Sequence, residues 1–387
     1  MTRDVIIVGA GPAGSASAID LARRGFDVLL LDARSFPRSK PCGDAISPGA
    51  IPLLERLGVW DAVRAAPCEF IDGWSVRSPA GTWFDSTFSQ RRSGSPPHGL
   101  CIDRALLDHT LVEAARASGV EVIEGMRVFD LMRAGGRTRG VVARGPDGET
   151  RAFDGRFVVG ADGLRSRVAR RLGPVTRGKR ARLALVSRWS GVDGPRGRGE
   201  MRVSGEGALG FVALGGGTAN VTMVVPIAEG SALAPDPLPF FRDRAARYGL
   251  ERRLEGARLD RPIEVTGPFE VTPYRRTAPG TLLAGDAAGY LDPFTGQGVF
   301  RALDGATIAV DAVTHILRET ATEPAALRAY ERELTRRLRV SRAVQRGVDF
   351  VISRPGRIDA LAGVLRAQPR LASWLADTTG DRVKRRV

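Results

Sequence analysis

The hydrophobic pattern of the first 35 residues predicts one β-α-β unit. Val5–Val8 is a continuous apolar run, as expected of a buried parallel strand. A glycine-rich turn follows at residues 9–14, and apolar side chains then recur at helical spacing over Ser15–Arg24. Gly25 ends this helix, and a second apolar run ends on the acidic residue Asp32. We therefore expect an α/β fold that begins with a helix between two parallel strands.

The rest of the chain alternates predicted helices and strands. The pattern predicts a helix over Ala105–Ser118 and a strand over Val120–Val128. Residues 173–266 alternate β-rich runs with Gly and Pro turns, which predicts a further sheet that part of residues 71–97 also joins. From residue 326 onward, apolar residues recur at helical spacing. We expect this tail to pack onto the main body; a helix lying on a membrane surface is the alternative.

The composition is that of a globular protein. The 387 residues, 43% hydrophobic and 26% charged, suffice for two or three domains, or for one large domain with a smaller one inserted. No apolar run approaches the ~18 residues of a membrane-spanning helix. The few residues before the first strand leave no room for a signal peptide, and the three cysteines cannot form a fully paired disulfide framework. We therefore expect a cytoplasmic protein without an integral membrane segment.

The charge balance is strongly positive, with 58 Lys and Arg against 43 Asp and Glu, a formal net charge of +15. Such a charge can attract nucleic acid or an acidic membrane surface. However, the arginines are spread along the whole chain with acids among them, which indicates a compositional bias. We expect no nucleic-acid partner, whereas peripheral membrane contact stays open. The three histidines lack metal-ligand spacing, so no metal site is expected.

The glycine turn and the acid after the second strand predict a dinucleotide site. Gly9 permits the tight turn, Gly11 lets the backbone approach a pyrophosphate, and Gly14 lets helix and strand pack closely. Ala13 lies in the same turn, where the helix N-terminus offers free N–H groups to phosphates. Asp32 is expected to accept hydrogen bonds from a ribose diol. We assign these five residues to cofactor binding.

Two later segments resemble motifs of the FAD-dependent oxidoreductases that share the para-hydroxybenzoate-hydroxylase fold. Residues 157–170 are similar to the family's A-D-G-x-x-S-x-V-R stretch, and residues 281–298 are similar to its G-D-A-A…P…G-x-G signature. The resemblance implies that Asp162 lies between FAD and the approach path of a nicotinamide, and that Asp286 binds the second ribose of FAD. It also assigns three residues before the predicted helix Val299–Leu317 to cofactor binding: Gly296, Gln297 and Gly298.

The resemblance also implies a domain organisation. A Rossmann-type FAD-binding domain, similar to that of glutathione reductase (GR2-like), would comprise residues 1–70, 98–172 and 267–325. A β-sheet substrate domain would comprise residues 71–97 and 173–266 and roof the flavin, and residues 326–387 would form C-terminal helices.

Two residues of the middle FAD segment receive roles by the same resemblance. Arg104 resembles the family arginine that neutralises the FAD pyrophosphate; a solvated arginine at a helix start is the alternative. The backbone of Val128 would meet the adenine. Because no second glycine fingerprint is present, NADH or NADPH would bind transiently as electron donor, or a separate partner reductase would replace it.

Residues 35–44 are similar to the F-P-R-x-K-x-C-G stretch of the geranylgeranyl-reductase branch. That branch reduces prenyl and quinone chains and includes related hydroxylases. Its prenyl reductases carry an aromatic strand facing the flavin, whereas the corresponding stretch here is Ala208–Leu214. We therefore predict an FAD-dependent monooxygenase that hydroxylates or epoxidises a small apolar or aromatic, natural-product-like substrate with O2, through a flavin C4a-hydroperoxide.

The main alternative is reduction of carbon–carbon double bonds in a prenyl or polyene substrate. For that reaction the branch motif places Cys42 and Asp44 beside the isoalloxazine as candidate catalytic residues that supply a proton. A packed cysteine and a helix-capping aspartate are the structural interpretation of the same pair. A halogenase, or an escort protein that has lost FAD, agrees less well with the motifs.

Overall fold

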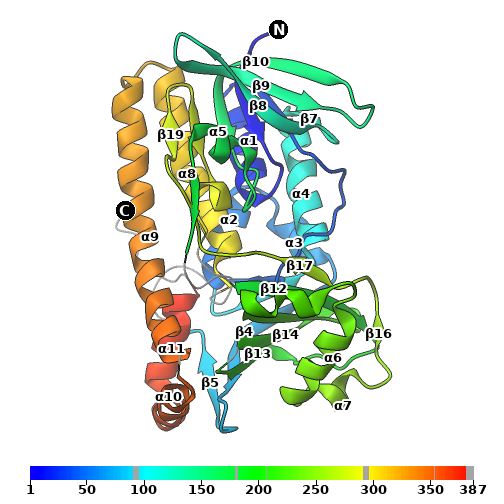
Figure 1. Cartoon of the computed structure of the whole chain (residues 1–387). Coiled ribbons are helices and arrows are strands. Elements are labelled where there is room, and N and C mark those ends of the chain that lie inside the picture. The colour runs from blue at the N-terminus through cyan, green and yellow to red at the C-terminus, as the bar shows by residue number, and fades with distance from the viewer. Residues whose placement is uncertain (90–95, 179–181, 206, 291–295, 353, 381–387) are drawn as a thin grey trace.

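The computed structural model describes residues 1–89, 96–178, 182–205, 207–290, 296–352 and 354–380 (Figure 1). The helical segments are α1 Pro12–Arg23, η1 Pro48–Ala50, α2 Ile51–Arg56, α3 Trp60–Ala65, α4 Arg104–Ala117, α5 Arg167–Leu172, η2 Ile227–Leu233, α6 Leu238–Arg247, α7 Glu251–Leu254, η3 Gly285–Ala288, α8 Gly298–Leu317, α9 Glu323–Ile352, α10 Pro355–Ala367 and α11 Pro369–Thr379.

The strands fall partly between these helices and partly in consecutive runs such as β7 to β10 and β11 to β15. They are β1 Arg3–Val8, β2 Val28–Leu31, β3 Ala45–Ile46, β4 Cys68–Arg77, β5 Trp83–Thr87, β6 Gly99–Ile102, β7 Glu121–Ile123, β8 Arg127–Ala134, β9 Arg137–Arg144, β10 Thr150–Gly160, β11 Val175–Arg177, β12 Arg182–Ser190, β13 Gly197–Ser204, β14 Gly207–Gly215, β15 Thr218–Pro226, β16 Arg258–Leu259, β17 Glu264–Thr266, β18 Val271–Pro273, β19 Thr277–Ala278 and β20 Thr281–Leu283.

The first sheet has the strand order β19-β20-β10-β1-β2-β7. Its central strands are parallel, with Val5 opposite Val28 on one side and Phe157 on the other. Val5–Val8 of β1 and all of β2 are apolar and buried because helices cover the sheet, and α1 contacts both α4 and α8. The predicted β-α-β unit and the α/β fold class are confirmed.

The predicted strand Val120–Val128 is wrong in one respect, because the structure has two strands there. β7 ends at Ile123 and pairs with β2, whereas β8 begins at Arg127 and pairs with β9. Gly125 lies between them with φ of +75°, a left-handed conformation that interrupts an extended chain. The hydrophobic pattern does not reveal this turn because apolar residues flank it on both sides.

The second sheet has the order β16-β12-β15-β14-β13-β4-β6-β3. In addition, β17 pairs with β12 and β5 pairs with β4. Residues 71–97 contribute to it through β4 and β5, in agreement with the prediction. β3 and β6 complete its edge, although both come from segments that the sequence assigns to FAD binding. Helix α6 packs on this sheet, where the Phe241 ring stacks on Trp189 at a centroid distance of 5.9 Å. The two regions thus share a boundary around residues 42–46 and 99–104.

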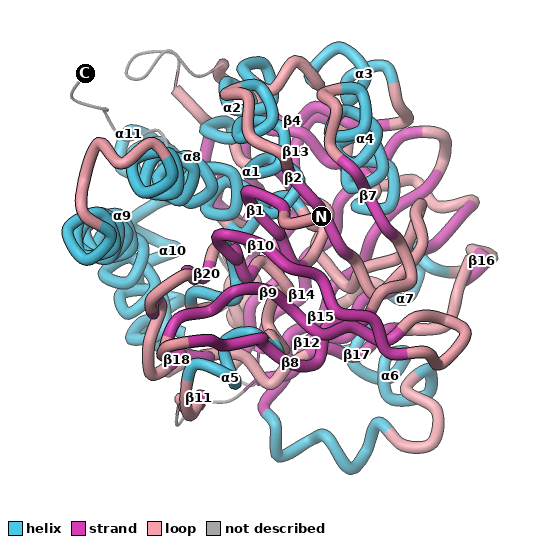
Figure 2. The backbone as a smooth tube through the Cα atoms, turned by 90° about the horizontal axis from the view of Figure 1, so that it is seen from above, coloured by secondary structure: helices cyan, strands magenta, loops and turns pink. Residues whose placement is uncertain are grey.

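The C-terminal helices lie against the main body, in agreement with the prediction. α9 runs along α8, while α10 and α11 contact β5 at the edge of the second sheet. Figure 2 shows α8 to α11 grouped on one side of the sheets. Among the described residues, no helix is both long and apolar enough to cross a membrane.

Candidate active site

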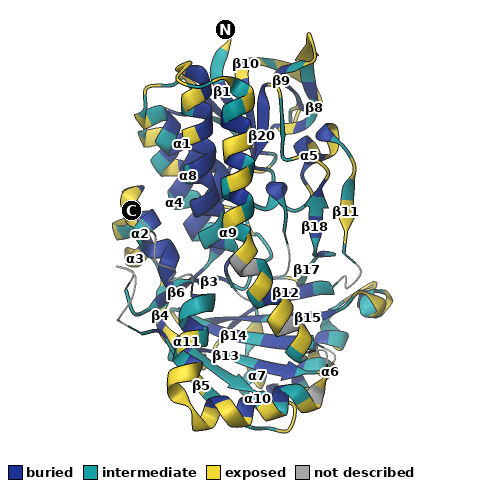
Figure 3. Ribbon diagram, turned by 90° about the vertical axis from the view of Figure 1, so that its left-hand side faces the viewer, coloured by how far each residue is buried: buried dark blue, intermediate teal, exposed yellow. Residues whose placement is uncertain are grey.

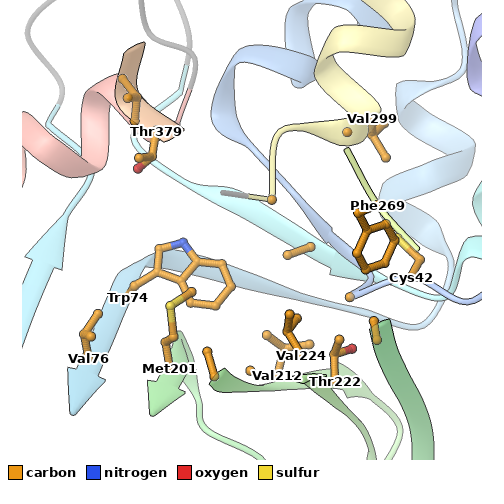
Figure 4. Close-up of a pocket in the computed structure, with 18 of the residues that line it drawn as sticks. Cys42, Trp74, Val76, Met201, Val212, Thr222, Val224, Phe269, Val299 and Thr379 are labelled. Atoms are coloured by element: carbon orange, nitrogen blue, oxygen red, sulfur yellow. The ribbon is translucent and has the colours of Figure 1, made fainter. Parts of the chain in front are cut away.

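A cavity of about 670 Å³ connects the two regions of the fold. One end lies at the N-termini of α1 and α8; the other lies between the second sheet and helices α9 to α11 (Figure 4). Such a volume is in the range of sites for organic cofactors and ligands. The predicted site residues that line it are Gly11, Ala13, Cys42, Arg104, Asp286, Gly296 and Gly298.

The glycine turn after β1 divides into positions needed by the fold and one open to the cavity. A Cβ on Gly9, whose φ is +100°, would lie 2.5 Å from the Ala161 carbonyl oxygen. A Cβ on Gly14 would lie 1.8 Å from the Gly9 carbonyl oxygen. In contrast, the nearest atom to a Cβ on Gly11 is Arg38 Nη2, at 3.9 Å. The space beside Gly11 is therefore a cradle that a side chain would fill, as a dinucleotide phosphate requires.

Two helix N-termini face the cavity from neighbouring positions. α1 begins after Gly11, and α8, a helix of 20 residues, begins at Gly298. A Cβ on Gly296 or on Gly298 would meet nothing within 4 Å. Both ends present backbone N–H groups and positive dipole ends, which suits a pyrophosphate and a reduced flavin that carries negative charge. Gln297 does not line the cavity; it is buried, and its side-chain oxygen accepts a hydrogen bond from Arg301.

The acids predicted to bind the ribose groups lie on either side of the glycine turn. Asp32 is buried and accepts hydrogen bonds from the Ala10 and Arg34 N–H groups, at 2.8 and 2.9 Å. Arg38 Nη2 lies 3.8 Å from its carboxylate, while Arg38 Nε is buried without a hydrogen-bond partner among the described residues. Asp286 lines the cavity from η3. The open cradle, Asp286 and the orphaned guanidinium nitrogen together fit an FAD molecule, whereas Asp32 is not among the cavity-lining residues.

Arg104 lies in the cavity wall but already has a partner. Its guanidinium donates two hydrogen bonds to the Asp108 carboxylate, both at 2.9 Å, and Nη1 lies 3.6 Å from Cys42 Sγ. Burial opposes its charge, but Asp108 and Cys42 outweigh burial and raise the pKa of Arg104. Lys40 also lines the cavity, and burial together with Arg104 lowers the pKa of its ammonium group. Our sequence assignment missed Lys40, although the branch motif contains it.

Cys42 and Asp44, the predicted catalytic pair, point to different places. Cys42 lines the cavity, whereas Asp44 is buried outside it and has φ of +56°. The Asp44 carboxylate forms an ion pair with Arg188 and accepts a hydrogen bond from Asn220 Nδ2 at 2.6 Å. Burial raises the pKa of Asp44 to about 6, against the opposite effect of Arg188. The Asp44 N–H donates to Cys42 Sγ at 3.4 Å, so this residue also supports the thiol.

Asp162 and Val128 are not among the cavity-lining residues. The Asp162 carboxylate accepts hydrogen bonds from Ser166 Oγ at 2.5 Å and from the Arg167 N–H at 2.6 Å, and thereby binds the start of α5. Burial raises its pKa. Val128 is buried in β8 opposite Ala143. The cavity is instead lined by the neighbours of Asp162, namely Ala161, Gly163 and Leu164.

The part of the cavity away from α1 and α8 is mainly apolar, with hydroxyl groups from Ser78, Ser86, Thr378 and Thr379. In Figure 4, Trp74, Val76 and Met201 stand across the cavity from Cys42. The Trp74 ring lies close to Gly199, where a Cβ would come within 2.4 Å of it. Further residues of this part come from α9 to α11 and include Val351, Ile358, Leu361, Leu365, Leu371, Trp374 and Leu375. The helical spacing of apolar residues after position 326 does not indicate this role of the C-terminal helices.

A second pocket, of about 480 Å³, adjoins the cavity and shares Leu164 and Asp286 with it. Its wall carries three arginines, Arg165, Arg170 and Arg177. Neighbouring guanidinium groups bind phosphates well because they form charge-assisted, paired hydrogen bonds. A phosphate-bearing molecule can therefore lie beside the cofactor end of the main cavity.

Comparison with curated proteins finds relatives that are reductases. The chain is 30% identical over 348 residues to digeranylgeranylglycerophospholipid reductase 1 of Methanothermobacter thermautotrophicus, covering 85% of this chain and 81% of that protein. It is 30% identical over 330 residues to menaquinone reductase of Mycolicibacterium smegmatis, covering 80% and 76%.

A solved structure with the same fold is that of PqsL, a probable FAD-dependent monooxygenase from Pseudomonas aeruginosa. The TM-score is 0.76 at 22% sequence identity, over 93% of this chain and 99% of that one. A family model described as FAD binding domain matches residues 2–347. The match agrees with the cradle at Gly11 and the two helix N-termini, and the expected FAD cofactor and Rossmann-type fold are confirmed. This chain is an FAD-dependent oxidoreductase and belongs to the FAD-binding domain family.

Proposed function

We propose that the protein reduces carbon–carbon double bonds in a substrate with a long apolar chain. The observation that supports this most is the apolar cavity that begins at the cofactor end and continues between the second sheet and helices α9 to α11. The identity to reductases over most of the chain favours the same reaction. The sequence motifs alone favour oxygenation; the cavity and the relatives favour reduction instead.

When bound and reduced, FAD supplies a hydride equivalent to one carbon of the double bond. The other carbon must receive a proton, and we assign this proton to the Cys42 thiol in the cavity wall. The thiolate left behind is stabilised by the Arg104 guanidinium at 3.6 Å and by the Asp44 N–H at 3.4 Å. In this proposal Cys42 is the catalytic residue, and Asp44 is a positioning residue.

The electron donor we propose is NADH or NADPH, bound transiently. The pocket lined by Arg165, Arg170 and Arg177 supports this choice, because it can take the donor's phosphates next to Asp286. A partner reductase in place of the nucleotide is the alternative. Titrating flavin reduction with each nucleotide distinguishes the donors.

Oxygenation is the second candidate function. The observation that favours it is strand β14, which presents Ala208, Gly210 and Val212 to the cavity. Prenyl reductases of the branch that the sequence resembles carry aromatic residues there. The small side chains leave space for a substrate ring beside the cofactor.

We expect reduced holoenzyme to be reoxidised by a geranylgeranyl lipid in the complete absence of oxygen. Replacing the proton donor in Cys42→Ala should slow this reoxidation roughly a hundredfold, because general-acid catalysis is worth about 10²–10⁴ in rate. FAD content should stay unchanged. Anaerobic stopped-flow absorbance at the flavin band measures both quantities.

The matched control is Cys101→Ala, which alters a buried cysteine that does not line the cavity. If substrate reoxidises the flavin only when O2 is present and the product carries one labelled oxygen atom, the enzyme is an oxygenase. Anaerobic reduction at full rate by Cys42→Ala would leave the thiol without a catalytic role.

Trp74 should limit the chain length of the substrate, because its ring lines the cavity beside Gly199. Trp74→Ala should raise kcat/KM for substrates that are longer by one or two isoprene units, roughly tenfold relative to the shorter ones. A gain of this size is expected because each additional buried methylene changes the discrimination of an apolar pocket by about tenfold or more. Trp83→Ala, which alters a half-exposed tryptophan outside the cavity, is the control. An unchanged preference over the series of lengths would contradict this role.

A further inference from the structure

We propose that the turn between α10 and α11 is a docking surface for an anionic lipid bilayer, from which an apolar substrate enters the cavity. We call residues 364–374 the docking turn. The second half of this statement rests on the proposed function; the first half does not, because binding to lipid requires no catalysis.

The docking turn contains the mouth of the cavity. Leu371 and Trp374 line the cavity and are also exposed, with 42% and 56% of their surface accessible. A side chain that meets both conditions stands at an opening. Val364, on the preceding helix, is 49% exposed. The outer face of α10 is drawn as largely exposed in Figure 3.

The inner face of the same two helices forms part of the cavity wall. Leu361 and Leu365 of α10 and Leu375 of α11 line the apolar part of the cavity. An apolar molecule that leaves a bilayer at the docking turn therefore meets a continuous apolar path into the cavity. Without a bound partner, the tryptophan and leucine at this opening would be exposed to water. Clustered exposed apolar side chains of this kind mark an interaction surface.

The charges around the docking turn determine which partner it fits. Arg366 and Arg370 are exposed on it. The acids of the two helices are hydrogen-bonded to the segments on either side of β5, since Asp359 accepts a hydrogen bond from the Ala80 N–H at 2.8 Å and Asp377 accepts one from the Ser89 N–H at 2.9 Å. Apolar side chains flanked by outward arginines suit a lipid surface with anionic headgroups, where tryptophan prefers the interface.

The first test is cosedimentation of FAD-loaded, full-length protein with vesicles. We expect vesicles of phosphatidylcholine with about 30% phosphatidylglycerol to bind at least tenfold more strongly than phosphatidylcholine alone. Arg366→Glu/Arg370→Glu should lower the partition coefficient on the anionic vesicles roughly tenfold or more, since each basic residue near such a surface contributes roughly fivefold. The matched control, Arg242→Glu/Arg252→Glu on α6 and α7, should bind like the unaltered protein.

The second test concerns the apolar part. Leu371→Ser/Trp374→Ser should weaken vesicle binding about tenfold, whereas Ile227→Ser, at an exposed apolar position on η2, should not. Brominated acyl chains should quench tryptophan fluorescence of the unaltered protein, and Trp374→Phe should remove most of that quenching. Quenching that persists in Trp374→Phe would mean that another surface meets the lipid.

Three outcomes overturn the proposal: no vesicle binding, equal binding to neutral and anionic vesicles, or binding that both double variants retain. A dimer that Leu371→Ser/Trp374→Ser dissociates would show instead that a second copy of the chain covers the docking turn. Failure of the proposed reaction is distinguishable, because it would leave vesicle binding intact. Conversely, Arg366→Glu/Arg370→Glu should keep its FAD, and it should turn over at the normal rate a short-chain substrate that dissolves in water without detergent.

Discussion

Gly11→Val should give a folded protein that purifies without FAD. In the structure, a Cβ at this position meets only the end of the Arg38 side chain, at 3.9 Å, so the apoprotein can accommodate the new side chain. The valine methyl groups would instead occupy the cradle that the cofactor phosphates need. Overpacking of this kind costs about 3 kcal/mol or more, which corresponds to at least a roughly hundredfold loss of FAD affinity. The ratio of flavin to protein absorbance measures it.

The neighbouring glycine provides the contrast. Gly14→Val should fail to fold, because its Cβ would lie 1.8 Å from the Gly9 carbonyl oxygen, within the backbone of the same turn. Circular dichroism and thermal melting separate a folded protein without flavin from an unfolded one. Gly11→Val protein that retained a full complement of FAD would show that the cofactor does not lie against this turn.

Asp44→Ala should destabilise the protein by about 3 kcal/mol, because it leaves the buried Arg188 guanidinium without its main partner. We expect the low end of the range for a broken buried pair, since Asp103 also pairs with Arg188. For a chain of 387 residues this corresponds to a decrease in Tm of roughly 4 °C. The measurement should be made above pH 7, because the pKa of Asp44 of about 6 keeps its carboxylate ionised there.

Two variants separate charge from shape at this position. Asp44→Asn tolerates the φ of +56° and keeps an acceptor for Asn220, so it should lose less stability than alanine. Asp61→Ala breaks an exposed pair with Arg64 and should change Tm very little. A loss at Asp44→Ala no greater than that at Asp61→Ala would mean that the network around Arg188 does not hold the two regions together.

This network lies where the FAD-binding region meets the second sheet. Arg188 and Asn220 are opposite one another on β12 and β15, and they reach Asp44 and Asp103 in the loops beside α4. Asn220 Nδ2 also donates to the Cys42 carbonyl oxygen at 2.9 Å. Weakening the junction should therefore also shift Cys42 in the cavity wall.

The sequence alone determines the dinucleotide turn and the family. Both depend on local geometry: Gly9 needs a positive φ, Gly14 must be small where helix and strand cross, and an acid must end the second strand. Such requirements restrict the residue type at fixed spacing, so they can be read directly from neighbouring positions. The predicted fold class, FAD and the helix that begins next to Gly296 were accessible for the same reason.

Only the tertiary structure decided which predicted residues reach the cavity. Cys42 and Asp44 are two positions apart, but the left-handed backbone at Asp44 aims its carboxylate at Arg188 and Asn220, which are 144 and 176 residues away in the chain. The Asp162 carboxylate similarly binds the start of α5. The role of α9 to α11 in the cavity wall depends on how their apolar faces meet the second sheet. An apolar helical period specifies that a face is buried, but not against which surface, because burial of apolar area is non-directional.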